Sequence, residues 1–423
     1  MIKKWLFVFV VFLNHIVAAQ HVVLISIDGL RPEMYRDKSW PTPNLQMLMK
    51  QGVYANHIKS VFPSFTYPSH TAMLTGALPA RSGICYNAAS TGSAWNWFTK
   101  DIKVPTLWQA IKQNGLTSSA VEWPVSVSDD ITYNIPEIWN TKTPEDRITE
   151  VRKYATRGLI EEIEEHATGK LNGDNMNEEY LSLDENAGRM AAYIFKTYKP
   201  NLLCVHFAEV DGMEHEFGRE GDSVRLAVAT ADHAIGDILE AIERSGMKDS
   251  TTVIIVGDHG FSDIHEAIFP NTWLVKKGLH GFFFQPAGGS AFLYLKDPGN
   301  KALLDSIRTV LKNLPQATRK KFRIIEKPEL IKMGADKDAV MALAAIPGII
   351  FGGAADKESK PVSGGHHGYD PNIPEMYTGF IAAGAGINKG KAIHELCVTD
   401  IASLIAKLLG LQFNAPPFLF SCF

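Results

Sequence analysis

The 423-residue sequence contains only four cysteines, no basic stripe and no complete G-x-G-x-x-G fingerprint. Because no two cysteines are spaced as Cys-x-x-Cys, a cysteine-ligated metal site is not expected. The best match to the glycine fingerprint, residues 384–389 (GAGINK), lacks the third glycine, which argues against a dinucleotide-binding oxidoreductase. The 42 Lys and Arg residues are scattered and are outnumbered by 46 Asp and Glu residues. We therefore expect a small-molecule substrate and no nucleic-acid polymer.

The four cysteines, Cys85, Cys204, Cys397 and Cys422, allow three complete disulfide pairings, and the sequence does not choose among them. Cys204 lies in an apolar run and is expected to be a buried thiol. Cys397 and Cys422, both near the C-terminus, form the pairing to test. The sequence predicts no oligomeric state.

The N-terminal segment, residues 1–19, has the pattern of a secretory signal peptide. Lys3 and Lys4 precede an apolar run at residues 5–13, and small residues at 17–19 (VAA) precede the expected mature start at Gln20. The apolar run is too short to cross a bilayer comfortably. We therefore expect export to the periplasm or secretion, without stable membrane insertion.

Three short apolar runs have no helical periodicity and end near acidic residues: residues 22–27, 202–207 and 252–256. Helix-like stretches lie between and around them, at residues 43–51, 104–114, 186–198 and 226–245. This alternation predicts an α/β fold with a mostly parallel central sheet and helices on both faces. Ligands of open α/β sheets gather at the carboxyl ends of strands, so the acidic residues there are candidate site residues.

Two stretches break the alternation. Residues from about 140 to 185 are polar and charged, and are predicted to form a helical insertion or cap. Residues from about 278 to 365 begin with a strand-like run at 288–295 (GGSAFLYL) and are predicted to form an inserted α+β subdomain. The expected organisation is therefore one domain, residues 20–423, that carries these two insertions.

Metal-binding residue types follow the predicted strands or lie in a glycine-framed loop. They are Asp28, Asp211 with His215, Asp258 with His259, and the pair His366-His367. Each alone is equally well explained as a helix cap, a turn residue or a surface residue. The spacing of four between Asp211 and His215 puts both on one face of a helical turn. Together, Asp and His at four strand or loop exits suit two adjacent divalent metals of the zinc class.

A two-metal site supports in-line displacement at phosphorus, and this reaction needs a nucleophile. Residues 62–70 (FPSFTYPSH) offer a hydroxyl for this purpose, that of Thr66. The segment leads into a helix-like stretch at residues 70–75. A hydroxyl at a helix start experiences the N-terminal dipole, and a metal lowers its pKa further. Thr66 and Ser69 are equally plausible helix caps, so the segment alone leaves the role of Thr66 open.

The order of these segments resembles the nucleotide pyrophosphatase/phosphodiesterase family of the alkaline phosphatase superfamily. The resemblance rests on Asp28, FPSFTYPSH, Val-Asp-x-x-x-His-x-x-Gly, Asp-His-Gly and Gly-x-His-Gly-Tyr-Asp, in this order along the chain. It continues to residues 379–384 (GFIAAG) and 408–411 (LLGL), and so covers nearly the whole mature chain. It implies an alkaline phosphatase-like core in a secreted, bacterial-type member.

By matching positions, the resemblance implies one zinc ion held by Asp28, Thr66, Asp258 and His259, and a second held by Asp211, His215 and His367. His367 is preferred to His366 because it directly precedes Gly-Tyr-Asp. Asn87 matches the asparagine that helps hold a non-bridging phosphoryl oxygen, although Tyr86 stands where the family usually has Asp. Tyr67 matches an aromatic residue placed against the leaving group or the base, and core packing beside Pro68 is the equal alternative.

The resemblance further implies a hydrolase that cleaves phosphodiester or pyrophosphate bonds of nucleotides through a covalent phosphothreonine and releases a nucleoside 5′-monophosphate. Two divalent ions, three aspartates and one alkoxide make a near-neutral site, which favours a diester over a monoester dianion. Phe65 also stands where the family often has Lys. The alternatives are a phosphomonoesterase or phosphonoacetate hydrolase of the same superfamily, a phospholipid or choline phosphodiesterase, and a metal-dependent binding protein without turnover.

Overall fold

The computed structural model describes residues 20–415 except 89–93, 144–145, 178–180 and 354–355. The predicted signal peptide lies outside the described residues, and so does Cys422 of the predicted pairing. Cys85, Cys204 and Cys397 are free thiols, and Cys204 is buried as expected. None of the described helices combines the length and the apolar character needed to cross a membrane.

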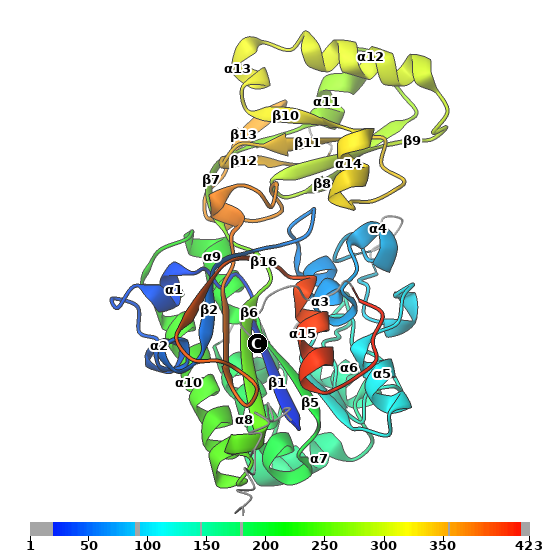
Figure 1. Ribbon diagram of the computed structural model, residues 1–423. Coiled ribbons are helices and arrows are strands. Elements are labelled where there is room, and N and C mark those ends of the chain that lie inside the picture. The colour runs from blue at the N-terminus through cyan, green and yellow to red at the C-terminus, as the bar shows by residue number, and fades with distance from the viewer. Residues whose placement is uncertain (1–19, 89–93, 144–145, 178–180, 354–355, 416–423) are drawn as a thin grey trace, which may run out of the picture.

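An eight-stranded sheet forms the centre of the lower body in Figure 1, in the order β16-β2-β15-β6-β1-β5-β3-β4. Its strands are β1 (His21–Ile27), β2 (Val53–Lys59), β3 (Ser118–Val121), β4 (Tyr133–Ile135), β5 (Leu202–Phe207), β6 (Thr251–Gly257), β15 (Phe380–Gly384) and β16 (Lys391–Cys397). Neighbouring strands run parallel except at β15, which is antiparallel to both β2 and β6. The predicted mostly parallel sheet and its three central strands are therefore confirmed.

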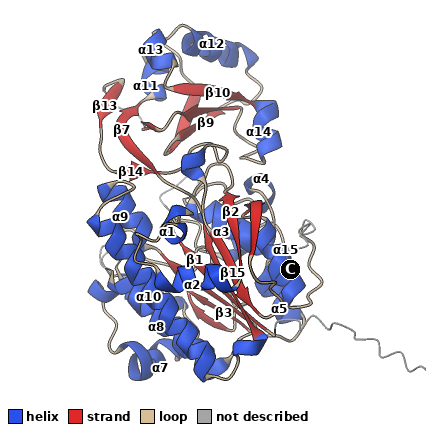
Figure 2. Cartoon of the chain, turned by 60° about the vertical axis from the view of Figure 1, so that its left-hand side comes forward, coloured by secondary structure: helices blue, strands red, loops and turns tan. Residues whose placement is uncertain are grey.

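Helices cover both faces of this sheet. One face carries α2 (Pro43–Gln51), α6 (Arg147–Tyr154), α7 (Leu159–Ile163), α8 (Ser182–Tyr198) and α10 (Asp222–Arg244), and the other carries α3 (Thr66–Thr75), α5 (Leu107–Gln113) and α15 (Asp400–Leu408). Figure 2 shows α8 and α10 together across the first face. In β1, Val23 and Ile25 pack toward the first group and Val22 and Leu24 toward the second, so the strand is buried on both sides.

The four predicted long helices are confirmed to within a few residues, but the predicted start of α3 is wrong. The helix begins at Thr66, not at His70. Pro68 falls in its first turn, where a missing N–H breaks no intrahelical hydrogen bond. Thr66 is therefore the first residue of a helix.

Short helical segments complete the lower body. They are α1 (Glu33–Arg36), α4 (Pro79–Ser82), α9 (Glu209–Phe217), the 3₁₀ turns η1 (Thr99–Asp101), η3 (Asp174–Met176), η4 (Lys248–Ser250) and η5 (Pro374–Met376), and the π-helical turn η2 (Glu164–Thr168). Of these, α9 has the clearest connection to function, because it follows β5 directly and carries Asp211 and His215.

A four-stranded antiparallel sheet in the order β10-β11-β9-β8 forms the upper body in Figure 1. Its elements are α11 (Pro270–Val275), β8 (Phe282–Ala287), β9 (Ser290–Leu295), α12 (Lys301–Lys312), α13 (Gln316–Arg319), β10 (Phe322–Glu326), α14 (Lys327–Met333) and β11 (Met341–Ala345). A smaller sheet joins β7 (Ser262–Ile268) with β12 (Gly348–Phe351), β13 (Ser359–Pro361) and β14 (Gly365–His366). Because β14 pairs with the start of β7, the histidine pair returns beside the loop that follows β6.

The N-terminus of α2 is capped from a distant helix. Asp232 of α10 is buried and accepts the backbone N–H groups of Asn44 at 3.0 Å and of Leu45 at 2.8 Å. Thr42, the residue before α2, provides no side-chain cap. The carboxylate therefore satisfies helix N–H groups that would otherwise be buried without an acceptor.

We expect Asp232→Ala to lower the free energy of unfolding by about 1–3 kcal/mol, because it leaves these donors unsatisfied. Urea denaturation of the full chain measures the change. Asp237→Ala is the matched control on the same helix, and it should change stability by less than about 0.5 kcal/mol. Equal losses in the two variants would contradict the capping role.

Candidate active site

Three adjacent parallel strands, β6, β1 and β5, end at the same edge of the sheet and bring carboxylates together there. Asp28 directly follows β1, Asp258 directly follows β6, and Asp211 lies in the first turn of α9 after β5. Asp28 and Asp258 are 4% and 0% exposed. Three of the predicted residues thus share one buried region.

Three histidines place their Nε2 atoms against these carboxylates. His259 Nε2 lies 3.2 Å from Asp28 Oδ1 and 3.1 Å from Asp258 Oδ2. The Nε2 atoms of His215 and His367 lie 3.3 Å and 3.6 Å from the two oxygens of Asp211. The rings of His259 and His367 stack at 3.7 Å between centroids, so the two sets of residues adjoin.

The other ring nitrogen of each histidine is held by the backbone. The Nδ1 atoms of His215, His259 and His367 contact the carbonyl oxygens of Gly365, Gly260 and Ser64 at 3.1, 3.3 and 2.9 Å. A carbonyl only accepts, so each Nδ1 carries the proton and each Nε2 presents a lone pair. Lone pairs facing carboxylate oxygens at these distances fit a divalent cation between them, and this donor set suits zinc.

Ligand atoms within 4.8 Å of one another form three groups among the described residues: Asp28-Asp258-His259, Asp211-His259-His367 and His215-His366-His367. The first matches the expected site. The second adds His259 to Asp211 and His367, so His259 lies between the two expected metals. In the third, His366 Nδ1 accepts the backbone N–H of His367 at 2.9 Å. This bond occupies the lone pair of the neutral ring, which favours His367 over His366 as a ligand.

Without a cation, the pKa values of the buried carboxyl groups Asp28 and Asp258 lie above their usual range. Burial, followed by the charge of Asp211, raises the pKa of Asp258 to about 7. Burial, followed by the charge of Asp258, raises the pKa of Asp28. Burial lowers the pKa of His259 and His367, so both rings are neutral. Oδ1 of Asp28 and Oδ2 of Asp258 also accept no hydrogen bond from the described residues. A cation relieves both conditions at once.

Thr66 joins this cluster at the first position of α3. Its Oγ1 lies 3.5 Å from His259 Nε2, and the side chain is 8% exposed. Asn87 Oδ1 accepts the backbone N–H of Tyr67 at 3.0 Å, which leaves the Asn87 amino group to donate elsewhere. Thr66, Tyr67 and Asn87 line one cavity of about 220 Å³ with Asp28, Asp211 and His367. The structure therefore brings the nucleophile candidate, the expected phosphoryl-binding residue and the ligand set together.

Tyr67 is more buried than a stacking surface requires. Its ring is 1% exposed, packs with Ile84 and Val125, and meets Trp95 edge-on at 5.2 Å between centroids. Trp95 lines the same cavity and is less buried. Core packing is therefore what the structure shows for Tyr67, and its contact with a leaving group or a base stays a prediction.

Several residues at the site were not predicted. Asp184 of α8 accepts the backbone N–H groups of Ala208 and Glu209 at 2.8 and 3.3 Å and so holds the start of α9. Arg31 Nε donates to Glu214 Oε1 at 2.9 Å, and both side chains are buried. This pair ties the chain after β1 to α9. The one sequence signal for Glu214 is its position directly before the candidate ligand His215.

His206 and Glu137 also line the cavity and were missed. His206 lies in β5, which is buried along its whole length, so no alternation of polar and apolar residues singles it out. Glu137 follows β4 and is 5% exposed. Its only sequence signal is its position after a short strand.

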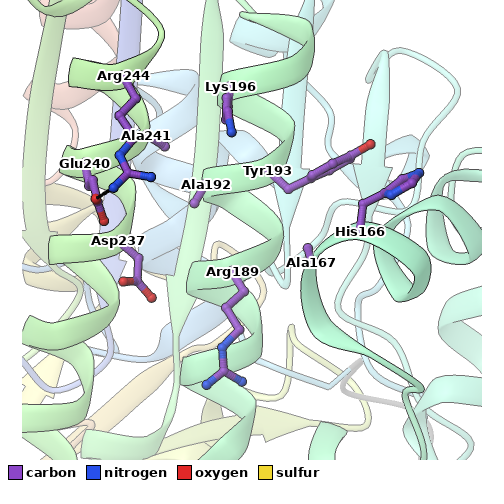
Figure 3. A pocket seen from close by; sticks show the side chains of 10 residues that line it. All are labelled: His166, Ala167, Arg189, Ala192, Tyr193, Lys196, Asp237, Glu240, Ala241 and Arg244. Atoms are coloured by element: carbon purple, nitrogen blue, oxygen red, sulfur yellow. Dashed lines mark ion pairs between the residues drawn. The ribbon is translucent and has the colours of Figure 1, made fainter.

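A second hollow of about 260 Å³ lies on the surface between α8 and α10 (Figure 3). Lys196 and Arg244 lie at the C-terminal ends of these helices, which precede β5 and β6 in the chain. The hollow therefore lies toward the amino ends of the strands. Arg244 pairs with Glu240, and Arg189 donates to Asn186 and Glu185. These charged side chains pair with one another in contact with solvent, whereas the carboxylates and imidazoles of the candidate site are buried.

Replacement of His367 tests the ligand assignment. We expect His367→Ala to reduce the divalent metal bound per chain, because it removes an Nε2 lone pair that the Ser64 carbonyl fixes toward Asp211. Metal content after dialysis, measured by inductively coupled plasma mass spectrometry, gives the result. His366→Ala is the neighbouring control and should keep the parental content. Unchanged metal in His367→Ala would exclude this residue as a ligand.

The metal-free protein should reveal the raised pKa of Asp258. A carboxyl whose pKa is higher in the folded state stabilises the fold below about pH 4 and loses that contribution as pH rises through about 7. Asp258→Asn cannot ionise and so escapes this loss. The unfolding free energy of Asp258→Asn minus that of the parent, both in chelator, should therefore increase from pH 4 to pH 8. The histidines titrate in both proteins, so a difference that stays flat would refute the assigned shift.

Comparison with known proteins places the chain in a family. A family model for type I phosphodiesterase / nucleotide pyrophosphatase matches residues 22–370. Bis(5′-adenosyl)-triphosphatase enpp4 of Mus musculus is 23% identical over 93% of this chain and 78% of its own length. Ectonucleotide pyrophosphatase/phosphodiesterase family member 7 of Rattus norvegicus is 22% identical over 93% of this chain and 84% of its own length.

Among solved structures, murine ectonucleotide pyrophosphatase/phosphodiesterase 5, an inactive threonine-to-alanine variant in complex with AMP, has a similar fold. The TM-score is 0.70 at 20% identity, over 94% of this chain and 97% of the murine chain. The expected fold class and the resemblance in the sequence are thereby confirmed. The chain is a hydrolase that belongs to the type I phosphodiesterase / nucleotide pyrophosphatase family.

Proposed function

We propose that this chain is a two-zinc phosphodiesterase that cleaves phosphodiester or pyrophosphate bonds of nucleotides and releases a nucleoside 5′-monophosphate, with Thr66 as nucleophile. The observation that carries the proposal is the position of Thr66. It is the first residue of α3, its Oγ1 lies 3.5 Å from His259 Nε2, and it lines the same cavity as Asp28, Asp211 and His367.

Asp28, Thr66, Asp258 and His259 would hold one ion, and Asp211, His215 and His367 the other. When bound, two divalent ions supply Lewis-acid stabilisation of the attacking and leaving oxygens. The chain supplies the positions of the reacting groups. The α3 dipole favours negative charge at Thr66 Oγ1, and Asn87 donates to a non-bridging phosphoryl oxygen.

The reaction proceeds in two displacements at phosphorus. In the first, Thr66 Oγ1 bonds to phosphorus, the bond from phosphorus to the leaving oxygen breaks, and the leaving group departs as an alcohol or a phosphate. In the second, water attacks the phosphothreonine, the bond from phosphorus to Oγ1 breaks, and the Thr66 hydroxyl is restored. The nucleoside 5′-monophosphate is the product of the second step.

The charges around the cavity support a diester substrate. None of the described residues that line it is Lys or Arg, whereas Glu137 adds a carboxylate to those of Asp28 and Asp211. A monoester dianion needs additional positive charge that this lining does not offer. The named activities of the relatives, and the AMP bound to the murine structure, support a nucleotide substrate. Trp95 supplies an aromatic surface in the cavity, and stacking of a base on such a ring contributes about 1–3 kcal/mol.

Export is part of the proposal. The signal-peptide pattern at residues 1–19 supports it, and we propose that the mature enzyme acts in the periplasm or outside the cell.

One kinetic comparison tests the proposed function. We expect the zinc-loaded parent to show a much higher kcat/KM on p-nitrophenyl thymidine 5′-phosphate than on p-nitrophenyl phosphate. Thr66→Ala should keep at least one metal ion and lose diesterase turnover by about a thousandfold or more, because no other hydroxyl replaces Oγ1. A preference for the monoester would move the enzyme to phosphatase chemistry. Full activity of Thr66→Ala would remove Thr66 from its role.

A further inference from the structure

Asn87, the expected phosphoryl-binding residue, is held by α3 and by a neighbouring loop. Its side-chain oxygen accepts the backbone N–H of Tyr67. Its backbone carbonyl accepts the N–H of Asn96 at 2.9 Å, and the side-chain amide of Asn96 donates to the carbonyl oxygen of Tyr86 at 2.8 Å. Asn96 therefore contacts the backbone on both sides of the Asn87 side chain, and a shift of Tyr86 would be transmitted to that side chain.

The side chain of Tyr86 packs against the upper body. Tyr86 is 5% exposed and lies in an apolar cluster with Phe62, four residues before Thr66, and with Phe292 of β9. The ring centroids of Tyr86 and Phe292 are 5.5 Å apart, and those of Phe62 and Phe292 are 5.0 Å apart. The segments that carry Asn87 and Thr66 therefore pack on the same strand of the upper body.

The hydroxyl of Tyr86 begins a chain of hydrogen bonds that ends in the upper body. It lies 2.7 Å from the hydroxyl of Tyr294, which follows Phe292 by two residues in β9, and Tyr294 donates to Asp336 Oδ2 at 2.5 Å. Because the carboxylate takes the Tyr294 proton, Tyr86 donates the bond between the two hydroxyls. Burial raises the pKa of both phenols, so both keep their protons. Asp336 Oδ1 accepts the backbone N–H of Asp338 at 2.8 Å, so the carboxylate is fixed too.

A second contact ties the same segment to the upper body. The backbone N–H of Ala80 in α4 donates to the carbonyl oxygen of Gly334, at the end of α14, at 2.9 Å, and Figure 1 shows α4 below α14. Residues 80–86 are thus attached to the upper body at both ends. Apolar packing is non-directional, whereas a buried hydroxyl has to meet its partner. The hydrogen-bond chain therefore fixes Tyr86 more closely than packing alone would.

We propose that Tyr86 is a positioning residue: through its hydrogen-bonded hydroxyl it fixes the backbone of Asn87, so that the Asn87 amino group meets a non-bridging phosphoryl oxygen. The chain to Tyr294 and Asp336 makes the upper body part of this positioning. A donor displaced from the developing charge loses much of its effect on the transition state. The inference rests on the proposed function, which gives Asn87 its role.

A double-mutant cycle tests whether Tyr86 acts through Asn87. The zinc-loaded parent, Tyr86→Phe, Asn87→Ala and the double variant are compared on p-nitrophenyl thymidine 5′-phosphate. We expect Asn87→Ala to lower kcat about a hundredfold, and Tyr86→Phe, which keeps the ring and its packing, to lower it about tenfold. In the Asn87→Ala background, Tyr86→Phe should change kcat by less than about twofold, because the donor that it positions is gone. A tenfold loss in both backgrounds would overturn the inference.

Further variants separate positioning from general support of the fold. Tyr294→Phe breaks the same chain from the upper body and should reproduce the loss with the same dependence on Asn87, which keeps the test decisive where Tyr86→Phe fails to fold. Asp336→Asn still offers Tyr294 a hydrogen-bond partner and should retain most of the turnover, whereas Asp336→Ala should share the loss. Full turnover of both Tyr86→Phe and Tyr294→Phe would equally overturn the inference.

Two controls accompany these variants. Tyr193→Phe removes a phenol hydroxyl that donates to Glu162 at 2.6 Å, away from the candidate site, and should keep the parental kcat. The metal content of Tyr86→Phe should also stay parental, because none of the expected ligands is changed. A loss of bound metal in Tyr86→Phe that matches its loss of turnover would show a general structural role and contradict the inference.

Failure of the inference and failure of the proposed function give different results. A parent that prefers p-nitrophenyl phosphate overturns the proposed function before any variant is compared. A parent that prefers the diester, with a Tyr86→Phe loss that is independent of Asn87, overturns only the inference. If Asn87→Ala keeps the parental kcat on the diester, the role of Asn87 and the inference both fall, while Thr66 keeps its proposed role.

Discussion

The burial of several carboxylates at one edge of the sheet is the constraint on which the rest of the site depends. Because β6, β1 and β5 pair in parallel, the residues that follow them, Asp258, Asp28 and Asp211, lie close together at one edge of the sheet. Like charges in a buried place are unfavourable unless they are protonated or neutralised by cations. Neutral imidazoles cannot neutralise them, but they supply further lone pairs. The arrangement is therefore costly by itself and well suited to divalent metals.

The rest of the chain is organised to aim ligands at these carboxylates. Backbone carbonyls fix the tautomers of the three histidines, and Asp184 and Arg31 hold α9 from two sides. The upper body is inserted between the loop after β6 and His367, and the pairing of β14 with β7 closes it. The conformational entropy lost when a loop closes grows only slowly with its length. A long insertion between two ligands is therefore compatible with a rigid site. Ligands far apart in sequence thus depend on one local strand pairing.

The sequence was sufficient for the central sheet, for the long helices and for the residues that gather at the strand ends, because each lies at a strand exit or in an ordered motif. It was insufficient where tertiary contacts decide. The start of α3 was placed too late, since Pro68 is tolerated in a first turn. The cap of α2 comes from Asp232 on a distant helix, and local patterns carry no trace of it. His206 sits in a strand buried on both faces, where periodicity does not separate functional from packing residues.

The same burial sets the polarity of the cavity lining. A lining with carboxylates, neutral imidazoles and no Lys or Arg among the described residues is rich in acceptors once the metals have taken their ligands. His70 Nδ1 donates to the Thr66 carbonyl at 2.8 Å, and His70 Nε2 lies 3.0 Å from His206 Nδ1, so two buried imidazoles are linked to the backbone of the nucleophile. The first turn of α3 is thereby tied to β5, the strand that leads into α9, so the positions of Thr66 and Asp211 depend on the same buried contacts.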